Sequence, residues 1–149
     1  MGSALPEKSM RIIPVALALF HRQSGETLEV WTQVRTDDGI FHGLLEFPGG
    51  GIESGETPLL ASIREVKEEV GIDISASDAK FLGTYSRMLT GKTVLLYLFL
   101  FPEYPGLSEK GQWLRIEKEK LSSPYQGQIP GPNHQMIDDL YRYLYDGRL

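Results

Sequence analysis

GGIESGETPLLASIREVKEEVGI, residues 50–72, joins a glycine-rich turn to a short amphipathic helix. On a helical wheel at about 100° per residue, Glu65, Glu68 and Glu69 share one face. Like charges on one helical face repel each other, so this cluster destabilises the helix unless a cation neutralises it. Carboxylate oxygens suit Mg²⁺, which binds a few carboxylates together with substrate phosphates. The segment therefore predicts a site for a divalent metal.

The other face of the same helix is apolar, and both of its ends carry capping residues. The aliphatic residues of this face are Leu59, Ile63, Val66 and Val70. Thr57 suits the N-cap, Pro58 the first helical position and Gly71 the left-handed position after the last turn. We expect a helix from about residue 58 to residue 70. The alternative to a metal site is a solvated helix with an acidic outer face.

Three further residues at set distances extend the pattern. Arg64 directly precedes Glu65, and Glu56 lies eight residues before Arg64. Gly50 lies six residues before Glu56. Together they match G-x5-E-x7-R-E-U-x-E-E-x-G-U, where U is aliphatic, and a chance match in this chain has a probability on the order of 10⁻⁷. On these residues the sequence resembles the Nudix hydrolases.

The resemblance implies an α/β fold, a mixed β-sheet sandwiched between helices with a loop-helix-loop catalytic motif. It also implies hydrolysis of a phosphoanhydride in a nucleotide, with Mg²⁺ as cofactor and Mn²⁺ as a substitute. Glu65, Glu68 and Glu69 would be catalytic metal ligands. The backbone carbonyl of Gly50 would be a further ligand.

Other positions of the motif receive roles through the same resemblance. Arg64 would pair with Glu56 and hold the loop against the helix; the alternative is a surface ion pair worth under about 1 kcal/mol. Gly49 and Gly51 would allow a substrate to approach the backbone closely. For these glycines the alternative is an ordinary tight turn.

An acid outside the motif would help to activate water. We select Glu109, which lies shortly before Trp113, and place Glu103 second. The alternative for both is a solvated loop carboxylate. A general base is defined first by its geometry, which the sequence does not supply.

Two segments outside the motif resemble the family's oxidised-purine triphosphatases. From the stretch RTDDGIFHGLLEFPGG, residues 35–50, Arg35 would contact phosphates, and Phe47 or Leu45 would line the nucleoside pocket. From the stretch IPGPNHQMI, residues 129–137, Asn133 would read a purine edge, because its amide offers both donors and an acceptor. The alternatives are a surface role for Arg35 and an N-cap role for Asn133.

One departure from those triphosphatases concerns the residue after the two glycines. A lysine commonly stands there, whereas this chain has Gly51. Lys92, Arg87 or Lys110 would replace its charge.

Because some relatives remove pyrophosphate from RNA, we expect a pyrophosphohydrolase acting on a purine nucleoside 5′-triphosphate, free or at an RNA 5′ end. The alternatives are hydrolysis of a nucleoside-diphosphate sugar or a dinucleoside polyphosphate, and a non-catalytic nucleotide sensor, against which the intact REVKEE argues.

Length and composition agree with a small globular enzyme. The chain has 149 residues, which suits one domain over residues 10–149 after a flexible leader at residues 1–9. The net charge of −5 argues against broad binding to nucleic acid but not against recognition of one 5′ end. The chain has no cysteine, no membrane-length apolar run and no signal-peptide pattern, so we expect a cytoplasmic protein without membrane contact. The resemblance makes a homodimer possible.

The remaining segments predict a sheet and a second helix. Expected strands cover residues 11–21 with an interruption at Pro14, 28–34, 44–47, 81–88, 93–101 and 112–116. Turns are expected at residues 23–25 and 90–91, and the apolar strand 93–101 should lie centrally. A C-terminal helix over residues 133–145 would bury Met136, Ile137, Leu140 and Leu144. Trp113 and Tyr85 are candidates for stacking on a base, and the three histidines (His21, His42 and His134) have no metal-ligand spacing.

Overall fold

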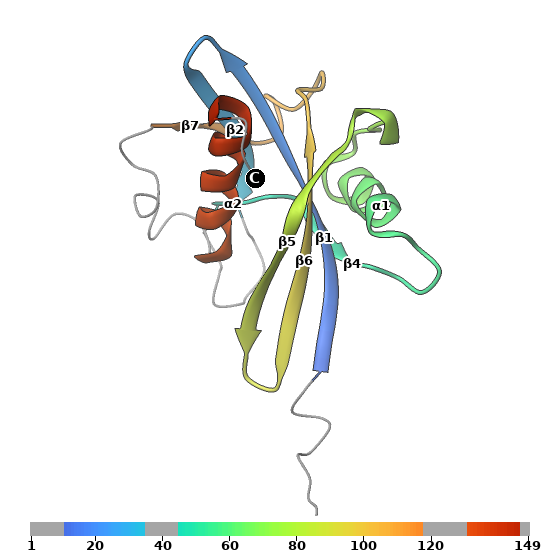
Figure 1. The fold of residues 1–149 in the computed structure, drawn as a ribbon. Helices are drawn as coiled ribbons and strands as arrows, with labels where there is room; N and C mark the ends of the chain where they lie inside the picture. The colour runs from blue at the N-terminus through green and yellow to red at the C-terminus, as the bar shows by residue number, and fades with distance from the viewer. Residues whose placement is uncertain (1–10, 35–44, 118–130, 147–149) are drawn as a thin grey trace, which may run out of the picture.

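The computed structural model describes residues 11–34, 45–117 and 131–146, and shows a mixed sheet with helices on both faces (Figure 1). The strands are β1 (Arg11–Ser24), β2 (Thr27–Val34), β3 (Leu45–Glu46), β4 (Gly49–Gly51), β5 (Lys80–Leu89), β6 (Lys92–Phe101) and β7 (Gln112–Ile116). The helices are α1 (Pro58–Val70), the 3₁₀ turn η2 (Ala76–Asp78), α2 (Gly131–Tyr141) and the π-helical turn η4 (Arg142–Asp146). The expected mixed sheet between helices is confirmed. No helix in the described ranges is long and apolar enough to cross a membrane.

The strand order is β3-β2-β1-β6-β5, with β4 paired to β1 and β7 paired to β2. β1 and β6 run parallel, and the other pairs are antiparallel. The apolar strand β6 lies between β1 and β5, as predicted. The two expected turns are present and form the hairpins β1–β2 and β5–β6. Because β1 continues to Ser24, the first turn consists of Gly25 and Glu26.

The predicted interruption at Pro14 is wrong, because β1 passes through it without a break. Pro14 is paired with Leu95 of β6, and its carbonyl accepts a hydrogen bond from Ile52 N at 3.1 Å on the opposite edge. In a strand the N–H and C=O of one residue point to the same edge. The nitrogen of Pro14 therefore faces the β4 side, and the β1–β6 ladder loses no hydrogen bond.

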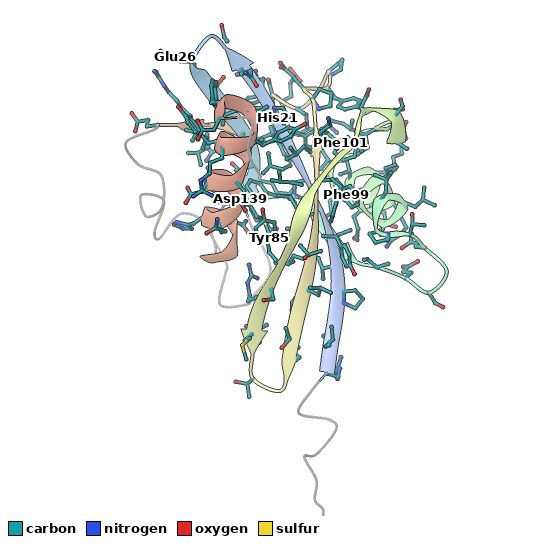
Figure 2. The ribbon with its side chains drawn as sticks, in the orientation of Figure 1. His21, Glu26, Tyr85, Phe99, Phe101 and Asp139 are labelled. Carbon is teal, nitrogen blue, oxygen red and sulfur yellow. The ribbon has the colours of Figure 1, made fainter. Side chains whose placement is uncertain are left out.

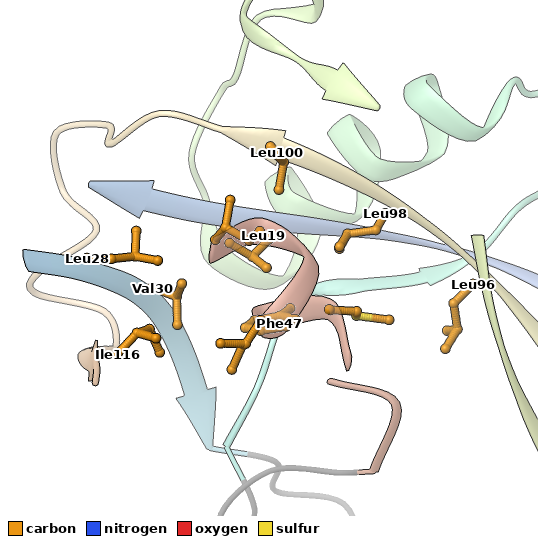
Figure 3. Packing of buried hydrophobic residues seen from close by; sticks show 11 residues of the cluster. Leu19, Leu28, Val30, Phe47, Leu96, Leu98, Leu100 and Ile116 are labelled. Carbon is orange, nitrogen blue, oxygen red and sulfur yellow. The ribbon is translucent and has the colours of Figure 1, made fainter. Parts of the chain in front are cut away.

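Alternation along the two central strands separates two apolar cores. Leu19 of β1 and Leu98 of β6 pack with α2 on one face of the sheet (Figure 3). Phe20 and Phe101, from the same strands, pack with α1 on the other face. Each helix is thus held by every second residue of β1 and β6.

The C-terminal helix differs from its prediction at both ends. α2 begins at Gly131, so Asn133 lies inside the first turn and the N-cap alternative is wrong. Beyond Tyr141 the chain forms the π-helical turn η4, where Leu144 is only partly buried. The predicted core residues Met136, Ile137 and Leu140 are fully buried. Tyr85 of β5 donates to Asp139 at 2.7 Å and ties the helix to the sheet (Figure 2).

Candidate functional site

Helix α1 has the predicted limits and the predicted caps. Thr57 Oγ1 accepts from Leu60 N at 3.2 Å, and Pro58 occupies the first turn. Gly71 has φ 78° and donates its N–H to the carbonyls of Val66 and Lys67. This left-handed conformation favours glycine. Local sequence therefore determines where the acidic helix begins and ends.

The predicted glycine loop is in part a short strand, β4, which pairs with β1. A Cβ on Gly49 would overlap the carbonyl oxygen of Ala16. A Cβ on Gly50 would lie 2.5 Å from Glu65 Oε1, inside van der Waals contact, whereas one on Gly51 would meet open space. The backbone of Gly50 therefore lies directly against the Glu65 carboxylate, and a side chain fits there only if that carboxyl group moves.

Replacing Gly50 by alanine should destabilise the metal-free protein by about 1 kcal/mol, because the new methyl group displaces the Glu65 carboxyl group from its place beside Arg64. The matched control is Gly51→Ala, where the space is open and the expected change is below about 0.5 kcal/mol. Urea unfolding of both variants measures the difference. Equal stability of the two variants would contradict the close contact between β4 and α1.

Arg64 joins the loop to the helix, as the resemblance implies. Its Nε donates to Glu56 Oε2 at 2.6 Å and its Nη2 to Glu56 Oε1 at 2.9 Å, a bidentate pair. Nη2 also donates to the Gly51 carbonyl at 2.9 Å. The Arg64 hydrogen bonds, together with one from the Glu53 N–H, lower the pKa of Glu56 to about 2. The contact with Glu56 in turn raises the pKa of Arg64.

Two motif carboxylates lie beside the same guanidinium. Arg64 Nη1 is 3.5 Å from Glu65 Oε2 and 3.3 Å from Glu68 Oε1. Burial raises the pKa of Glu65, the Arg64 charge opposes the rise, and the Glu68 charge adds to it. Arg64 therefore compensates part of the negative charge on this helical face.

Glu69 is held from the sheet rather than by Arg64. Its Oε1 accepts from Gln33 Nε2 of β2 at 2.8 Å. Although much of the residue is exposed, desolvation of its carboxyl group raises its pKa to about 7, and the charges of Glu65 and Glu46 add to the rise. Hydrogen bonds from Gln33 and the Gly49 backbone oppose it. Near neutral pH this group can hold either a proton or a cation.

The carboxylates do not form a ready-made metal cage. Among the described residues, no three or more His, Cys, Asp or Glu side chains converge closely enough to hold an ion. Arg64 holds Glu65 and Glu68, and Gln33 holds Glu69. Mg²⁺ usually keeps several waters and takes one or two carboxylates plus substrate phosphates, so these oxygen ligands fit it without a cage. The metal assignment stays a prediction.

A cavity of about 320 Å³ lies on the α2 face of the sheet, and Gly50, not the carboxylates of α1, is among its lining residues. Its apolar floor comes from alternate residues of β1 and β6. Its wall at β3 and β4 contains Glu46, Phe47 and both Gly49 and Gly50, and its far wall contains Arg87 and Lys92. The floor residues are Ile13, Val15, Leu17, Val94 and Leu96. Gly50 thus lies between the cavity and Glu65.

Only some of the predicted substrate-binding residues line the cavity. Phe47, Gly49 and Asn133 line it, and Phe47 and Asn133 are each only 3% exposed. Gly51 is not among its lining residues, but its carbonyl accepts from Arg64. Leu45 packs against the core instead, and Arg35 lies outside the described residues, as does His42.

The acids expected to activate water lie in the segment before β7. Glu103 forms an ion pair with Arg22 at 3.1 Å, which gives this carboxylate a structural role. Glu109 is exposed in the turn that precedes Gly111. In the next residue, Lys110 Nζ lies 3.2 Å from where a Cβ on Gly71 would be, so this turn approaches the C-terminal end of α1. The role of Glu109 stays a prediction.

The two aromatic candidates for base stacking have other partners. The Trp113 ring lies under the guanidinium of Arg22 at 4.1 Å, and Tyr85 binds Asp139. Neither lines the cavity. The sequence reasoning missed Gln33 and Glu46. Glu46 is part of the LEFPGG segment, whereas Gln33 has no local signal, because its contact with Glu69 joins β2 to α1 across 36 residues of the chain.

Comparisons with known proteins agree with the motif and the fold. The NUDIX domain family matches residues 11–124. The chain is 27% identical to the 8-oxo-dGTP diphosphatase of Haemophilus influenzae over 90% of this chain and 98% of that protein. It is 30% identical to the CTP pyrophosphohydrolase of Escherichia coli, over 65% and 67% of the two chains. The solution structure of the E. coli ORF135 protein superposes with a TM-score of 0.68 at 21% identity, over 95% and 96% of the chains.

A further similarity covers a shorter stretch. The chain is 36% identical to the RNA pyrophosphohydrolase of Legionella pneumophila over 76 residues, 51% of this chain and 42% of that protein. The names of these three relatives therefore give three different substrates, which are 8-oxo-dGTP, CTP and RNA.

Proposed function

Because the chain belongs to the Nudix hydrolase family, we propose that it hydrolyses a purine nucleoside 5′-triphosphate, either free or at the 5′ end of an RNA, with Mg²⁺ as cofactor. The observation that carries this proposal is the position of Gly50. Its backbone lines the apolar cavity and also touches the Glu65 carboxylate. A nucleoside in the cavity would therefore present its phosphates to the acidic helix.

Glu65 and Glu69, with the Gly50 carbonyl, are the first proposed metal ligands, and Glu68 is the next candidate. When bound, Mg²⁺ would screen the phosphate charge and lower the pKa of a water molecule. The chain itself positions these ligands through two contacts. Arg64 holds the loop to the helix, and Gln33 fixes the Glu69 carboxyl group.

The apolar floor and Phe47 would hold the nucleoside. Asn133 is buried at the α2 wall, where its amide can donate to and accept from a base edge. The naming of one relative as an 8-oxo-dGTP diphosphatase supports a purine. Glu109 is the proposed additional acid, on a turn that approaches the end of α1.

The test is the release of phosphate or pyrophosphate from a nucleotide panel with Mg²⁺ and with excess EDTA. The panel contains GTP, 8-oxo-dGTP, ATP, CTP, a nucleotide sugar, a dinucleoside polyphosphate and a triphosphorylated RNA. We expect metal-dependent turnover, fastest on a purine triphosphate. A clear preference for CTP or for a nucleotide sugar would reject the purine assignment, and binding without turnover would indicate a sensor.

A further inference from the structure

Two cations lie at the end of the cavity farthest from the carboxylates. Arg87 of β5 is paired with Val94, and Lys92 at the start of β6 is paired with Leu89. Both side chains are half-buried and line the cavity. They are diagonal neighbours on one sheet face, with Cα atoms about 7–8 Å apart.

A third positive residue is placed at the same end by the parallel pairing of β1 and β6. Arg11 is the register partner of Lys92, so its side chain leaves the sheet on the same face. Within the described ranges, Lys92 has no ion-pair partner. Among the described lining residues the one carboxylate, Glu46, lies on β3 at the opposite end. An anion bound beside Lys92 would balance the charge of this lysine.

The strand register gives the distance between the two ends. Gly50 is level with Ala16 of β1, whereas Arg87 is level with Ile13, three residues away. Three strand spacings separate β4 from β5. At about 3.3 Å per residue and about 4.8 Å per strand, the Cα atoms of Gly50 and Arg87 are about 17 Å apart. One phosphate group cannot contact Arg87 while it is bound beside Glu65.

Arg87 and Lys92 are therefore expected to contact a different phosphate from the one that is bound beside Glu65. We infer that Arg87 and Lys92 form a second anion subsite, which binds a phosphate that the nucleoside carries on the side away from the scissile anhydride. The apolar floor between the two ends accommodates the nucleoside itself. The ligand class is a nucleoside 5′-polyphosphate with a phosphate on its 3′ oxygen, either a 3′-phosphomonoester or the first phosphodiester of an RNA. This inference rests on the proposed function, because it takes the carboxylate end as the site of hydrolysis.

Binding without turnover gives the first test. Guanosine 3′,5′-bisphosphate and GMP are titrated into the metal-free protein by calorimetry, at low and at moderate salt. We expect the bisphosphate to bind about tenfold more tightly, with the difference decreasing as salt rises, because charge-assisted hydrogen bonds to the second phosphate are screened. In the double variant R87Q/K92Q the ratio of the two affinities should approach one. The single variants R87Q and K92Q should each lose part of the preference for the bisphosphate.

The matched control is Lys80→Gln, which removes one positive charge from β5, the strand that carries Arg87, at a position outside this cavity. It should keep the ratio of the wild type. Equal affinities in the wild type, or a ratio that the R87Q and K92Q variants leave unchanged, would overturn the subsite. Circular dichroism and thermal unfolding establish that each variant is folded, and the single variants replace the double variant if it is not.

Turnover gives the second test and separates the two sources of the phosphate. The kcat/KM of guanosine 5′-triphosphate 3′-monophosphate, of a triphosphorylated dinucleotide and of GTP is measured for each protein. A preference for either larger compound that disappears in R87Q/K92Q supports the subsite, and the larger ratio identifies the source. If neither is preferred, the subsite is rejected. If no nucleotide is hydrolysed but the bisphosphate still binds preferentially, the proposed reaction fails while the subsite stands.

Discussion

The variant Glu69→Gln is expected to lose about three orders of magnitude in kcat while remaining folded. Glutamine keeps the size of the side chain and its contact with Gln33 but removes the charge that we propose binds Mg²⁺. Because other ligands remain, some metal affinity should survive. Initial rates at saturating Mg²⁺ measure the loss, and Glu26→Gln, in the distant β1–β2 turn (Figure 2), is the matched control. Wild-type activity in Glu69→Gln would contradict the metal assignment.

The same variant should be more stable than the wild type at high pH in the absence of metal. The pKa of Glu69 is about 7 in the folded protein against 4.5 for the free group, so the folded state binds the proton more tightly. Ionisation therefore costs stability progressively between pH 4.5 and 7, and the full cost is present above pH 7. Because the residue is partly exposed, we expect a gain of only about 1 kcal/mol for Glu69→Gln at pH 8. Chemical denaturation at pH 4 should show no such gain.

The variant Arg64→Ala is expected to reduce both stability and activity. The guanidinium contacts the carboxylates of Glu53, Glu56, Glu65 and Glu68 and the Gly51 carbonyl. Its removal leaves these four carboxylates without that positive charge beside β4, so we expect the free energy of unfolding to fall. Activity should fall about 100-fold, because the loop that carries Gly50 is no longer held to α1.

Two comparisons test this explanation. Arg64→Lys keeps the charge but not the bidentate geometry, so it should recover part of the stability and little of the activity. Arg142→Ala removes an exposed pair with Asp139 and should cost less than about 0.5 kcal/mol.

The stability lost in Arg64→Ala should also shrink as the pH falls from 4.5 towards 2. The lowered pKa of Glu56 means that its contribution is present above the unfolded value and disappears when the carboxylate is protonated. A loss of stability that does not depend on pH in this range would contradict the ion-pair explanation.

Much of the acidic helix could be predicted because its signals are local. Thr57, Pro58 and Gly71 mark its ends within a few residues of the sequence, and the wheel separates its two faces. The pairing of Arg64 with Glu56 was also predictable, although it depended on the family resemblance as well as on spacing. The expectations that failed, a strand interruption at Pro14 and a helix beginning at Asn133, depend on a neighbouring strand and on where a helix starts.

The acidic helix, its caps and the family of the chain follow from local sequence, because each depends on residues close together along the chain. The rest of the site depends on how distant segments pack together. The parallel pairing of β1 with β6 forms the floor of the cavity, and β2 brings Gln33 to Glu69. The same sheet places Arg87 and Lys92 at the far end. Pairing between strands distant in sequence depends on the packing of both faces of the whole sheet, which no short segment encodes.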